Sequence, residues 1–544
     1  MTPRKRALSV VAGVVGAAVA TATAFTGVGA ASQSDGPALT NVPTANTKSD
    51  GYAPASRLSP ELAQIAAAQG ATRLENTSAL TSYYGYNNDT LNAAGQPQML
   101  PIPASQTEAH KTEPDKNTYL VFRHGLNGAD ASYDYGTHFL FQGHEGGAGG
   151  AGYITRINLD ADAAHRVTLL ATTDADGHPI ATIDGSTWDP WARRLLFTTE
   201  NETAPTYAAT PGYPSTVTDV SGALGRGGYE GIQNDSAGNI WIVEDITGPA
   251  KNGTTAKQPN SFVYRYVPAK PGDLSDGKLQ ALQVLNSAGD PITFESQAAL
   301  NSPDQVALHT YGQTFRTRWV TVHDTAAQGD SPFDANVAAK AAHATPFKRP
   351  ENGQFQPGSS FTTFFFDETG DTNATSPENA SSGGWGSIMK LTQGKPDAST
   401  GKLTMFYKSD EAHSGLDNNT FLSRDVVTFV EDAGDTLHAQ RNALDSGYAF
   451  DTTTDYSNPS NQPVRWLAEG RDASATIDSA FGGFGKNDGD NEITGVHVSD
   501  GDTGVGGILG AKVPNLNNPR WRWFYTQQHG DNTTWEVVPA GRQG

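Results

Sequence analysis

Six short apolar segments recur along the chain, and each ends in acids, histidines or other polar groups. Because both faces of each segment are apolar, each is predicted to be a strand buried between packed sheets. If six blades circle one axis, the inner strands bring these polar ends to the mouth of a central channel. The segments are Thr137–Glu145, Arg194–Glu200, Asn239–Asp245, Arg318–Asp324, Asp425–Asp432 and Trp521–His529.

The pattern therefore predicts an all-β fold, a six-bladed β-propeller with helical and loop insertions over the channel mouth. Carboxylates gathered at such a mouth repel one another, which raises their pKa, and a bound cation removes that cost. One helix is predicted within Asp334–Ala342, where an aspartate cap precedes several alanines. Another is predicted to follow Ser59-Pro60-Glu61 and to end at Gly70.

The composition suits many short strands joined by turns. Only 17% of the 544 residues are charged, whereas Gly (59) and Pro (31) are plentiful. Propellers exceed the usual domain size because each blade packs on its neighbours, so residues 59–544 are predicted to form one domain. The formal net charge of -21 disfavours nucleic acid as a partner and favours divalent cations.

The N-terminal residues have the pattern of an export signal, with Arg4-Lys5-Arg6 before an Ala/Val-rich run. Residues 1–31 are predicted to be this signal and residues 32–58 a flexible linker. No other segment is apolar for long enough to span a membrane, so an extracellular, cell-surface or periplasmic protein is expected. The chain has no cysteine, which leaves oxygen and imidazole as its metal ligands.

Two segments could carry chemistry. Glu230 begins the first strand of a predicted hairpin and Glu244 ends the second, and carboxylate oxygens suit Ca²⁺, although acids at strand ends can also be plain solvated residues. In Arg349-Pro350-Glu351, an extended backbone places both charged side chains on one face. Arginine can then fork onto a phosphate while the glutamate binds a metal, although such a tripeptide also occurs as an ordinary surface ion pair.

Other acids and histidines could be either functional residues or purely structural ones. Glu492 and Asp417 each adjoin a turn, where an acid can cap the backbone or bind a metal. His144, His323 and His529 could be acid catalysts, ligands or hydrogen-bonded structural residues. The chain has no nucleophile elbow, phosphate-binding glycine loop, nucleotide fingerprint or His-Glu-x-x-His motif, so an enzyme would be a metal-dependent hydrolase.

An ordered series of short motifs between about Tyr84 and Asn532 resembles the PhoX-type alkaline phosphatases. The series comprises Gly85–Asp89, Gly143-His144-Glu145, Thr198-Thr199-Glu200, Gly228-Tyr229-Glu230, Val243-Glu244-Asp245, Ala344–Glu351, Asp417-Asn418, Glu431-Asp432, Glu492–Gly495 and Gln528-His529.

This resemblance implies a six-bladed propeller whose channel holds several calcium ions, with iron in some members, and which hydrolyses phosphomonoesters at alkaline pH. It implies that Arg349 binds the phosphate. The metal ligands it implies are Glu145, Glu200, Glu230, Glu351, Glu431, Asp432 and Glu492. A small phosphorylated substrate is the expected partner, and a monomer is expected.

The sequence departs from the family pattern at three places. Thr199 stands where the iron-bearing members have a cysteine, so a thiolate-bound iron cannot form and an oxygen-only calcium cluster is favoured over Fe³⁺. Gly143 replaces the family's asparagine. The Arg4-Lys5-Arg6 stretch only approximates a twin-arginine signal, which leaves the export route open.

Two alternatives remain beside a secreted, calcium-dependent phosphomonoesterase. The same fold and metals could serve a phosphodiesterase, a phytase-like hydrolase or a lactonase, because fold does not fix reaction. A calcium-stabilised propeller that binds a ligand or partner without catalysis is the other. A substrate panel and an Arg349→Ala variant distinguish these hypotheses.

Overall fold

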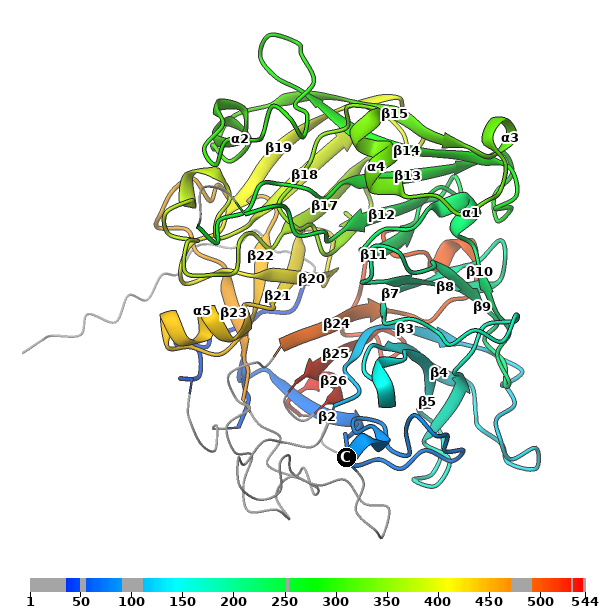
Figure 1. Ribbon diagram of the computed structural model, residues 1–544. Helices are drawn as coiled ribbons and strands as arrows, with labels where there is room; N and C mark the ends of the chain where they lie inside the picture. Colours follow the sequence, from blue (N-terminus) through cyan, green and yellow to red (C-terminus); the bar gives the residue numbers. More distant parts are fainter. Residues whose placement is uncertain are drawn as a thin grey trace, which may run out of the picture. The chain divides into compact units, whose positions relative to one another are not determined.

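The computed structural model describes residues 36–48, 55–90, 111–250, 254–470, 492–529 and 532–541. All of them belong to one compact unit, Asp35–Gly544 (Figure 1). The predicted export signal, residues 1–31, lies outside the described residues. Within the described ranges no helix combines the length and the apolar composition needed to cross a membrane.

Four separate antiparallel sheets account for most of the strands. Their strand orders are β3-β4-β5-β6, β7-β8-β9-β10, β20-β21-β22-β23-β1 and β24-β25-β26-β2. Their bounds are β3 Pro114–Val121, β4 His138–His144, β5 Tyr153–Asn158, β6 Val167–Ala171, β7 Ile183–Asp189, β8 Arg194–Thr199, β9 Tyr207–Ala209, β10 Val217–Asp219, β20 Leu416–Phe421, β21 Val426–Glu431, β22 Ser446–Asp451, β23 Val464–Ala468, β1 Arg57–Leu58, β24 Glu492–Ser499, β25 Arg522–Gln528, β26 Thr533–Pro539 and β2 Leu62–Ala68.

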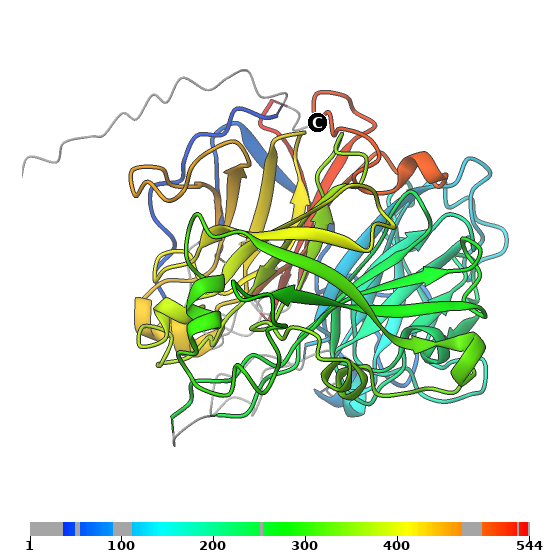
Figure 2. The same ribbon diagram turned by 90° about the horizontal axis from the view of Figure 1, so that it is seen from above.

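A fifth sheet has nine strands, because two groups of strands join at their outer edges (Figure 2, green to yellow). The junction is the pairing of β15 with β19, from Phe315 opposite Leu403 to Arg318 opposite Thr400. The strand order is β11-β12-β13-β14-β15-β19-β18-β17-β16. The bounds are β11 Tyr229–Asn234, β12 Ile240–Glu244, β13 Val263–Pro268, β14 Gly277–Leu285, β15 Phe315–Asp324, β16 Gly353–Phe355, β17 Thr363–Glu368, β18 Ser387–Gln393 and β19 Thr400–Lys408.

The strands that begin each group contact one another in a closed ring. β3 contacts β7, β7 contacts β11, β11 contacts β16, β16 contacts β20, β20 contacts β24, and β24 contacts β3. The other strands follow outward from this ring in sequence order, except β1 and β2, which complete the outer edges of two C-terminal sheets. The predicted all-β, propeller-like fold is confirmed, but the sheets are four separate ones and a nine-stranded one instead of six separate blades.

Five of the six apolar segments form the second strand of their group, as β4, β8, β12, β21 and β25. The prediction is wrong for Arg318–Asp324, which belongs to the outer strand β15. Its side chains alternate between buried and exposed positions. Asp324 caps the short helix α3 (Thr325–Gln328). The group without a matching segment begins with β16, and its second strand is β17, so apolar content alone does not distinguish a second strand from an outer strand.

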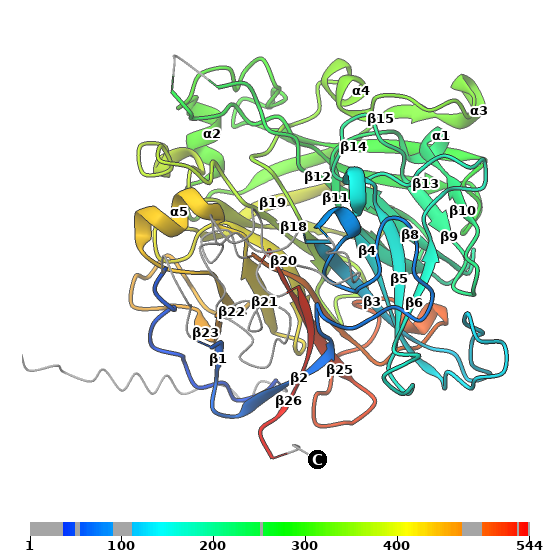
Figure 3. The same cartoon turned by 60° about the horizontal axis from the view of Figure 1, so that its bottom comes forward.

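The helix predicted after Ser59 is a strand instead. β2 pairs with β26, with Leu62 opposite Pro539, so an N-terminal segment completes a C-terminal sheet (Figure 3, blue beside red). The hydrogen bonds and packing of this ladder outweigh the helix propensity of the alanines. Part of the predicted linker also contacts the sheets, since the Val42 backbone N–H donates to the Arg465 carbonyl oxygen.

The described helices are short and lie between strands. The predicted helix at Asp334–Ala342 is confirmed as α4 (Ala335–Ala341), and the Asp334 side chain accepts a hydrogen bond from the Val337 N–H. α4 packs against β15. The other helices are α1 Ser221–Leu224, α2 Pro303–Leu308, α5 Gly434–Arg441 and the 3-10 turns Asn88–Thr90, Ala148–Gly150, Ala380–Ser382 and Val505–Gly507.

Candidate active site

One cavity of about 330 Å³ opens beside the ring of first strands, and nine of its twelve lining residues are acids. We call it the hub cavity. One arginine, one histidine and one glycine complete the lining. The twelve residues are Asp115, Glu145, Asp184, Glu200, Glu230, Asp245, Arg349, Glu351, Asp432, Gly434, Glu492 and His529.

A single rule of topology brings these acids together. The start of a first strand and the end of its antiparallel neighbour lie side by side, so each hairpin delivers two polar residues to the same edge. For example, Pro114 pairs with His144, which places Asp115 next to Glu145. The same rule gives the pairs Asp184 with Glu200, Glu230 with Asp245, Asp417 with Asp432, and Glu492 with His529.

A β-bulge interrupts the ladder near the start of five of the six first strands. The register shifts lie between Pro114 and Asn117, Ile183 and Ser186, Tyr229 and Ile232, Leu416 and Asn419, and Thr494 and His497. Bulges twist a strand and re-aim its side chains, and they are common beside active sites. Four of the acids, Asp115, Asp184, Glu230 and Asp417, lie inside these shifts.

Glycines beside the bulges allow the first strands to approach one another closely. A Cβ atom at Gly185 would lie 1.9 Å from the Glu230 carbonyl oxygen. At Gly231, the backbone N–H donates to the Glu351 carbonyl oxygen at 2.7 Å. These contacts fix the acids of three consecutive groups around the ring.

Asp184, Glu200 and Glu230 could hold a metal ion together, since each offers a carboxylate oxygen within 4.8 Å of the others. The donor chemistry fits a hard cation such as Ca²⁺. Oδ1 of Asp184, Oε2 of Glu230 and Oδ2 of Asp417 are also buried without any hydrogen bond from the described residues. Because buried polar atoms normally have partners, these oxygens fit a bound cation.

The electrostatics of the hub cavity agree with this fit. Burial raises the pKa of Asp184 well above the ordinary carboxyl value, and repulsion from Asp115 raises it further. Burial likewise raises the pKa of Glu230, and repulsion from Asp184 adds to the effect. Such groups resist ionisation unless a positive charge lies nearby.

Arg349 is held by acids on two sides of the cavity. Its Nε donates to Asp245 Oδ1 at 2.9 Å, and its second terminal nitrogen contacts Asp245 Oδ2 and Glu351 Oε1, both at 2.8 Å. Thr372 accepts from the other terminal nitrogen. Burial alone would lower the pKa of Arg349, but Asp245 and Glu351 raise it above its ordinary value. The guanidinium is therefore a fixed positive charge on the cavity wall.

Two further cations belong to this region. Lys116 is buried next to Asp115 in β3, and its Nζ donates to Asn352 Oδ1 at 2.5 Å, which links two groups of the ring. His529 lies 3.3 Å from Glu113 and 3.4 Å from Glu492. Burial would lower the pKa of His529, but hydrogen bonds with these acids raise it well above its ordinary value. Lys116 and His529 together offset only part of the negative charge of the hub acids.

The structure brings most of the predicted site residues into the hub cavity. These are Arg349, Glu145, Glu200, Glu230, Glu351, Asp432 and Glu492. Glu431 is placed elsewhere: it accepts hydrogen bonds from Arg441, at 2.9 Å, and from the Ser414 backbone N–H, at 3.0 Å. The reason is strand alternation, which turns Glu431 and Asp432 to opposite sides.

The prediction missed Asp115 and Asp184. Each is the second residue of a first strand, as Glu230 is in its own group, so the same hairpin pattern would have found them. Glu244, an alternative for its hairpin, is a structural residue, because Asn336, Phe262 and Tyr264 all donate hydrogen bonds to it.

The positions that depart from the family pattern have local explanations. A Cβ atom at Gly143 would lie 1.9 Å from Ile183 Cγ2, so this packing has no room for a larger residue. Thr199 is buried, and its hydroxyl donates to the Pro205 carbonyl oxygen at 3.0 Å.

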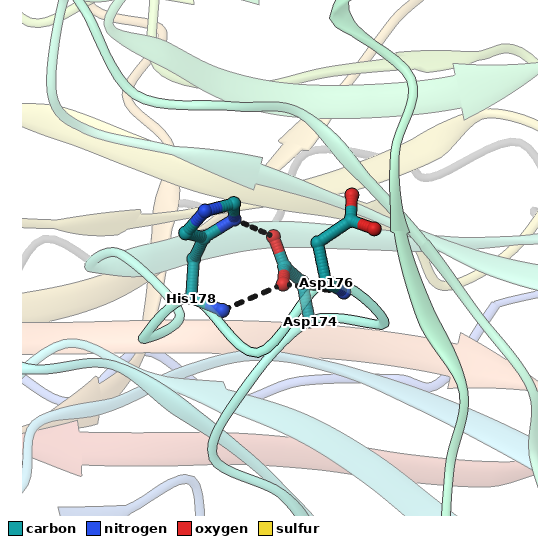
Figure 4. A group of neighbouring side chains, drawn as sticks. All are labelled: Asp174, Asp176 and His178. Atoms are coloured by element: carbon teal, nitrogen blue, oxygen red, sulfur yellow. Dashed lines mark hydrogen bonds and ion pairs between the residues drawn. The ribbon is translucent and has the colours of Figure 1, made fainter.

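A second group of possible ligands lies in a turn outside the hub cavity (Figure 4). Asp174 Oδ1 accepts the backbone N–H of His178 at 2.8 Å, and the His178 ring lies 3.2 Å from Asp174 Oδ2. Asp176 and His178 are exposed. These hydrogen bonds within the turn explain why the three side chains lie close together without a metal ion.

The chain matches the family model described as Alkaline phosphatase PhoX over residues 223–505. It is also similar in fold to a solved structure, Pseudomonas fluorescens PhoX in complex with vanadate, a transition state analogue. That match has a TM-score of 0.55 at 10% sequence identity and covers 92% of this chain and 98% of the other. None of the curated proteins matches the chain.

Proposed function

This chain belongs to the PhoX family of alkaline phosphatases, and on that premise we propose that it is an exported, calcium-dependent enzyme that releases phosphate from small phosphomonoesters in its hub cavity. Phosphoric monoester hydrolysis follows from the family. Calcium dependence, export and the roles of individual residues are the proposal. Export rests on the Arg4-Lys5-Arg6 stretch and the apolar run after it.

One observation carries the proposal: nine acids surround a small cavity that contains an arginine fixed between two of them. Such a concentration of carboxylates, of which Asp115, Asp184, Glu230 and Glu351 are buried, is unfavourable on its own. Divalent cations would stabilise it, and the same cations are what phosphate transfer requires.

Asp184, Glu200 and Glu230 would hold one metal ion, and Glu145, Glu351, Asp432 and Glu492 supply further carboxylates around the same cavity. When bound, divalent metals neutralise phosphoryl charge and lower the pKa of a water molecule. All these donors are oxygens, and the chain has no cysteine. This set favours calcium over a thiolate-bound iron.

Arg349 would bind the phosphoryl group, because a guanidinium donates in a fork that matches phosphate oxygens. Asp245 fixes its orientation through two bonds, at 2.9 and 2.8 Å. A preoriented cation of this kind stabilises transition-state charge without reorganising. The φ of Arg349 is 56°, an uncommon backbone conformation, so the prediction of an extended backbone at this residue is wrong.

We further propose that the ring corresponds to six blades, with β3, β7, β11, β16, β20 and β24 as the innermost strands. Two of these blades would share the nine-stranded sheet through the β15–β19 pairing. A monomer is the expected state, and gel filtration with light scattering tests it.

The test is hydrolysis of p-nitrophenyl phosphate by the mature protein at alkaline pH. A calcium chelator should abolish turnover, and added Ca²⁺ should restore it. A parallel panel with a bis-p-nitrophenyl phosphodiester and phytate checks the substrate class. Turnover that persists in metal-free protein would refute calcium dependence, and a preference for the diester would refute the assigned substrate class.

A further inference from the structure

A second cavity, of about 880 Å³, lies at the other end of two first strands. We call it the distal cavity. In β3, Asp115 lines the hub cavity and Val121 lines the distal one, about 20 Å farther along an extended strand. In β24, Glu492 begins the strand at the hub cavity, and Asp500 follows its other end. The two cavities share no lining residue.

The charge of the distal cavity is opposite to that of the hub cavity. Arg123, Arg193 and Arg520 line it and form no salt bridge with any described residue. A fourth cation, Lys512, is neutralised by Asp500 at 2.6 Å and Asp502 at 2.8 Å. These three arginines are exposed at the cavity, and arginine and lysine outnumber aspartate in its lining. They leave a positive field that an anion could satisfy.

The remaining walls suit an organic body with a planar part. The His138 ring is partly exposed and lies parallel to the buried Tyr119 ring, with an interplanar angle of 6°, and its ring nitrogen lies 2.9 Å from Asp160 Oδ2. Phe122 and Leu126 add apolar surface. The volume lies within the range of small-molecule sites. Arginines beside aromatic and apolar walls match a ligand with phosphate at one end and a ring at the other.

Lys116 lies on β3 between the residues that line the two cavities. It follows Asp115 in β3, and its bond to Asn352 crosses the ring between β3 and the residue before β16. A molecule in the distal cavity therefore does not reach the carboxylates of the hub cavity along β3. Binding at the distal cavity would be a function distinct from catalysis.

We propose that the distal cavity is a second, non-catalytic ligand site that binds a phosphorylated organic molecule with a planar ring. The ligand chemistry is that of a nucleotide. The site would let the enzyme bind an organic phosphate without hydrolysing it.

The experiment is calorimetric titration of the calcium-loaded protein with α,β-methylene-ADP, whose terminal phosphorus is joined through carbon and resists hydrolysis. Inorganic phosphate is the second probe. The double variant Arg123→Ala/Arg520→Ala should bind the nucleotide analogue at least about tenfold more weakly, because each arginine loses charge-assisted bonds. Arg316 is an exposed arginine on β15, so Arg316→Ala is the matched control and should bind the nucleotide analogue as the wild type does.

Arg349→Ala distinguishes the two cavities, since it should weaken binding at the hub cavity and leave the distal binding event in place. The Arg123→Ala/Arg520→Ala variant should hydrolyse p-nitrophenyl phosphate within about twofold of wild type, because distant sites act independently. The proposal is overturned if the folded double variant binds the analogue as tightly as wild type, or if no second binding event occurs. Equal affinity for inorganic phosphate at this site would overturn the organic part of the assignment.

Discussion

Glu431 and Asp432 are consecutive acids at the end of one strand, yet they belong to opposite electrostatic environments. Glu431 is buried with its own cation, Arg441, which also contacts Asp445 at 3.0 Å. Asp432 instead faces the hub cavity, where acids far outnumber cations. Glu431 is neutralised by its own cation and stabilises the fold, whereas the nine hub acids share one arginine and one histidine, an arrangement that a bound cation would stabilise.

Glu368 extends the comparison to the sixth hairpin. It ends the second strand β17, as Glu244 ends β12 and Glu431 ends β21, and the hub cavity is lined by the next residue in those two groups, Asp245 or Asp432. His309 lies 2.8 Å from Glu368 Oε2, and Ser387 and the Lys348 backbone N–H donate to the same carboxylate. An acid at the last residue of these second strands therefore has local partners away from the hub cavity, as strand alternation requires.

The largest expected effect separates Glu230 from Glu431. Glu230→Gln should lower kcat/KM for p-nitrophenyl phosphate by about 10³, because it removes a carboxylate from the proposed metal site. Glu431→Gln, measured per folded molecule, should stay within about threefold of wild type. Equal losses in the two variants would show that the two acids do not differ in role.

The next effect concerns Arg349, the cation on the wall of the hub cavity. Arg349→Lys should lower kcat/KM by about 10², because lysine keeps the charge but loses the fork that binds phosphate. Raised KM with unchanged kcat would instead indicate that Arg349 binds the substrate and the transition state equally strongly.

The third expectation concerns stability. Glu431→Gln should lower the free energy of unfolding by about 3 kcal/mol, since it removes one of the two carboxylates, Glu431 and Asp445, that neutralise the buried Arg441. Thermal or denaturant unfolding of the calcium-loaded protein measures this loss. An unchanged midpoint would mean that the pair adds no net stability.

The smallest effect is a difference in pH dependence. Interactions with His309 lower the pKa of Glu368 below 4.5, despite burial, so its stabilisation is complete above that pH and is lost as the pH falls through the depressed value. The pKa of Glu230 is raised, so in metal-free protein its ionisation destabilises the fold as the pH rises above 4.5.

Ionised Glu368 stabilises the fold, whereas ionised Glu230 destabilises the metal-free fold, so the two effects can be measured separately. In metal-free protein at neutral pH, Glu230→Gln should raise the melting temperature by a few degrees, whereas Glu368→Gln should lower it. Melting curves at several pH values compare the variants. A destabilised Glu230→Gln protein in chelator would contradict the assignment of Glu230 to a cation site.

The sequence predicted the all-β architecture and most of the hub cavity. Glu230 and Arg349 were found because a hairpin and an Arg-x-Glu tripeptide have recognisable local patterns. Glu431 could not be separated from Asp432, because its partner Arg441 lies ten residues later on a short helix. The strand at Leu62–Ala68 was missed because its pairing partner, β26, is about 470 residues away. Long-range pairing of this kind has no local signal.

The metal content of the purified protein tests the central claim most directly. Elemental analysis of the wild type should find more than one calcium ion per chain and no stoichiometric iron, and Glu230→Gln should contain less calcium. A fully active protein that contains no divalent metal would contradict the account.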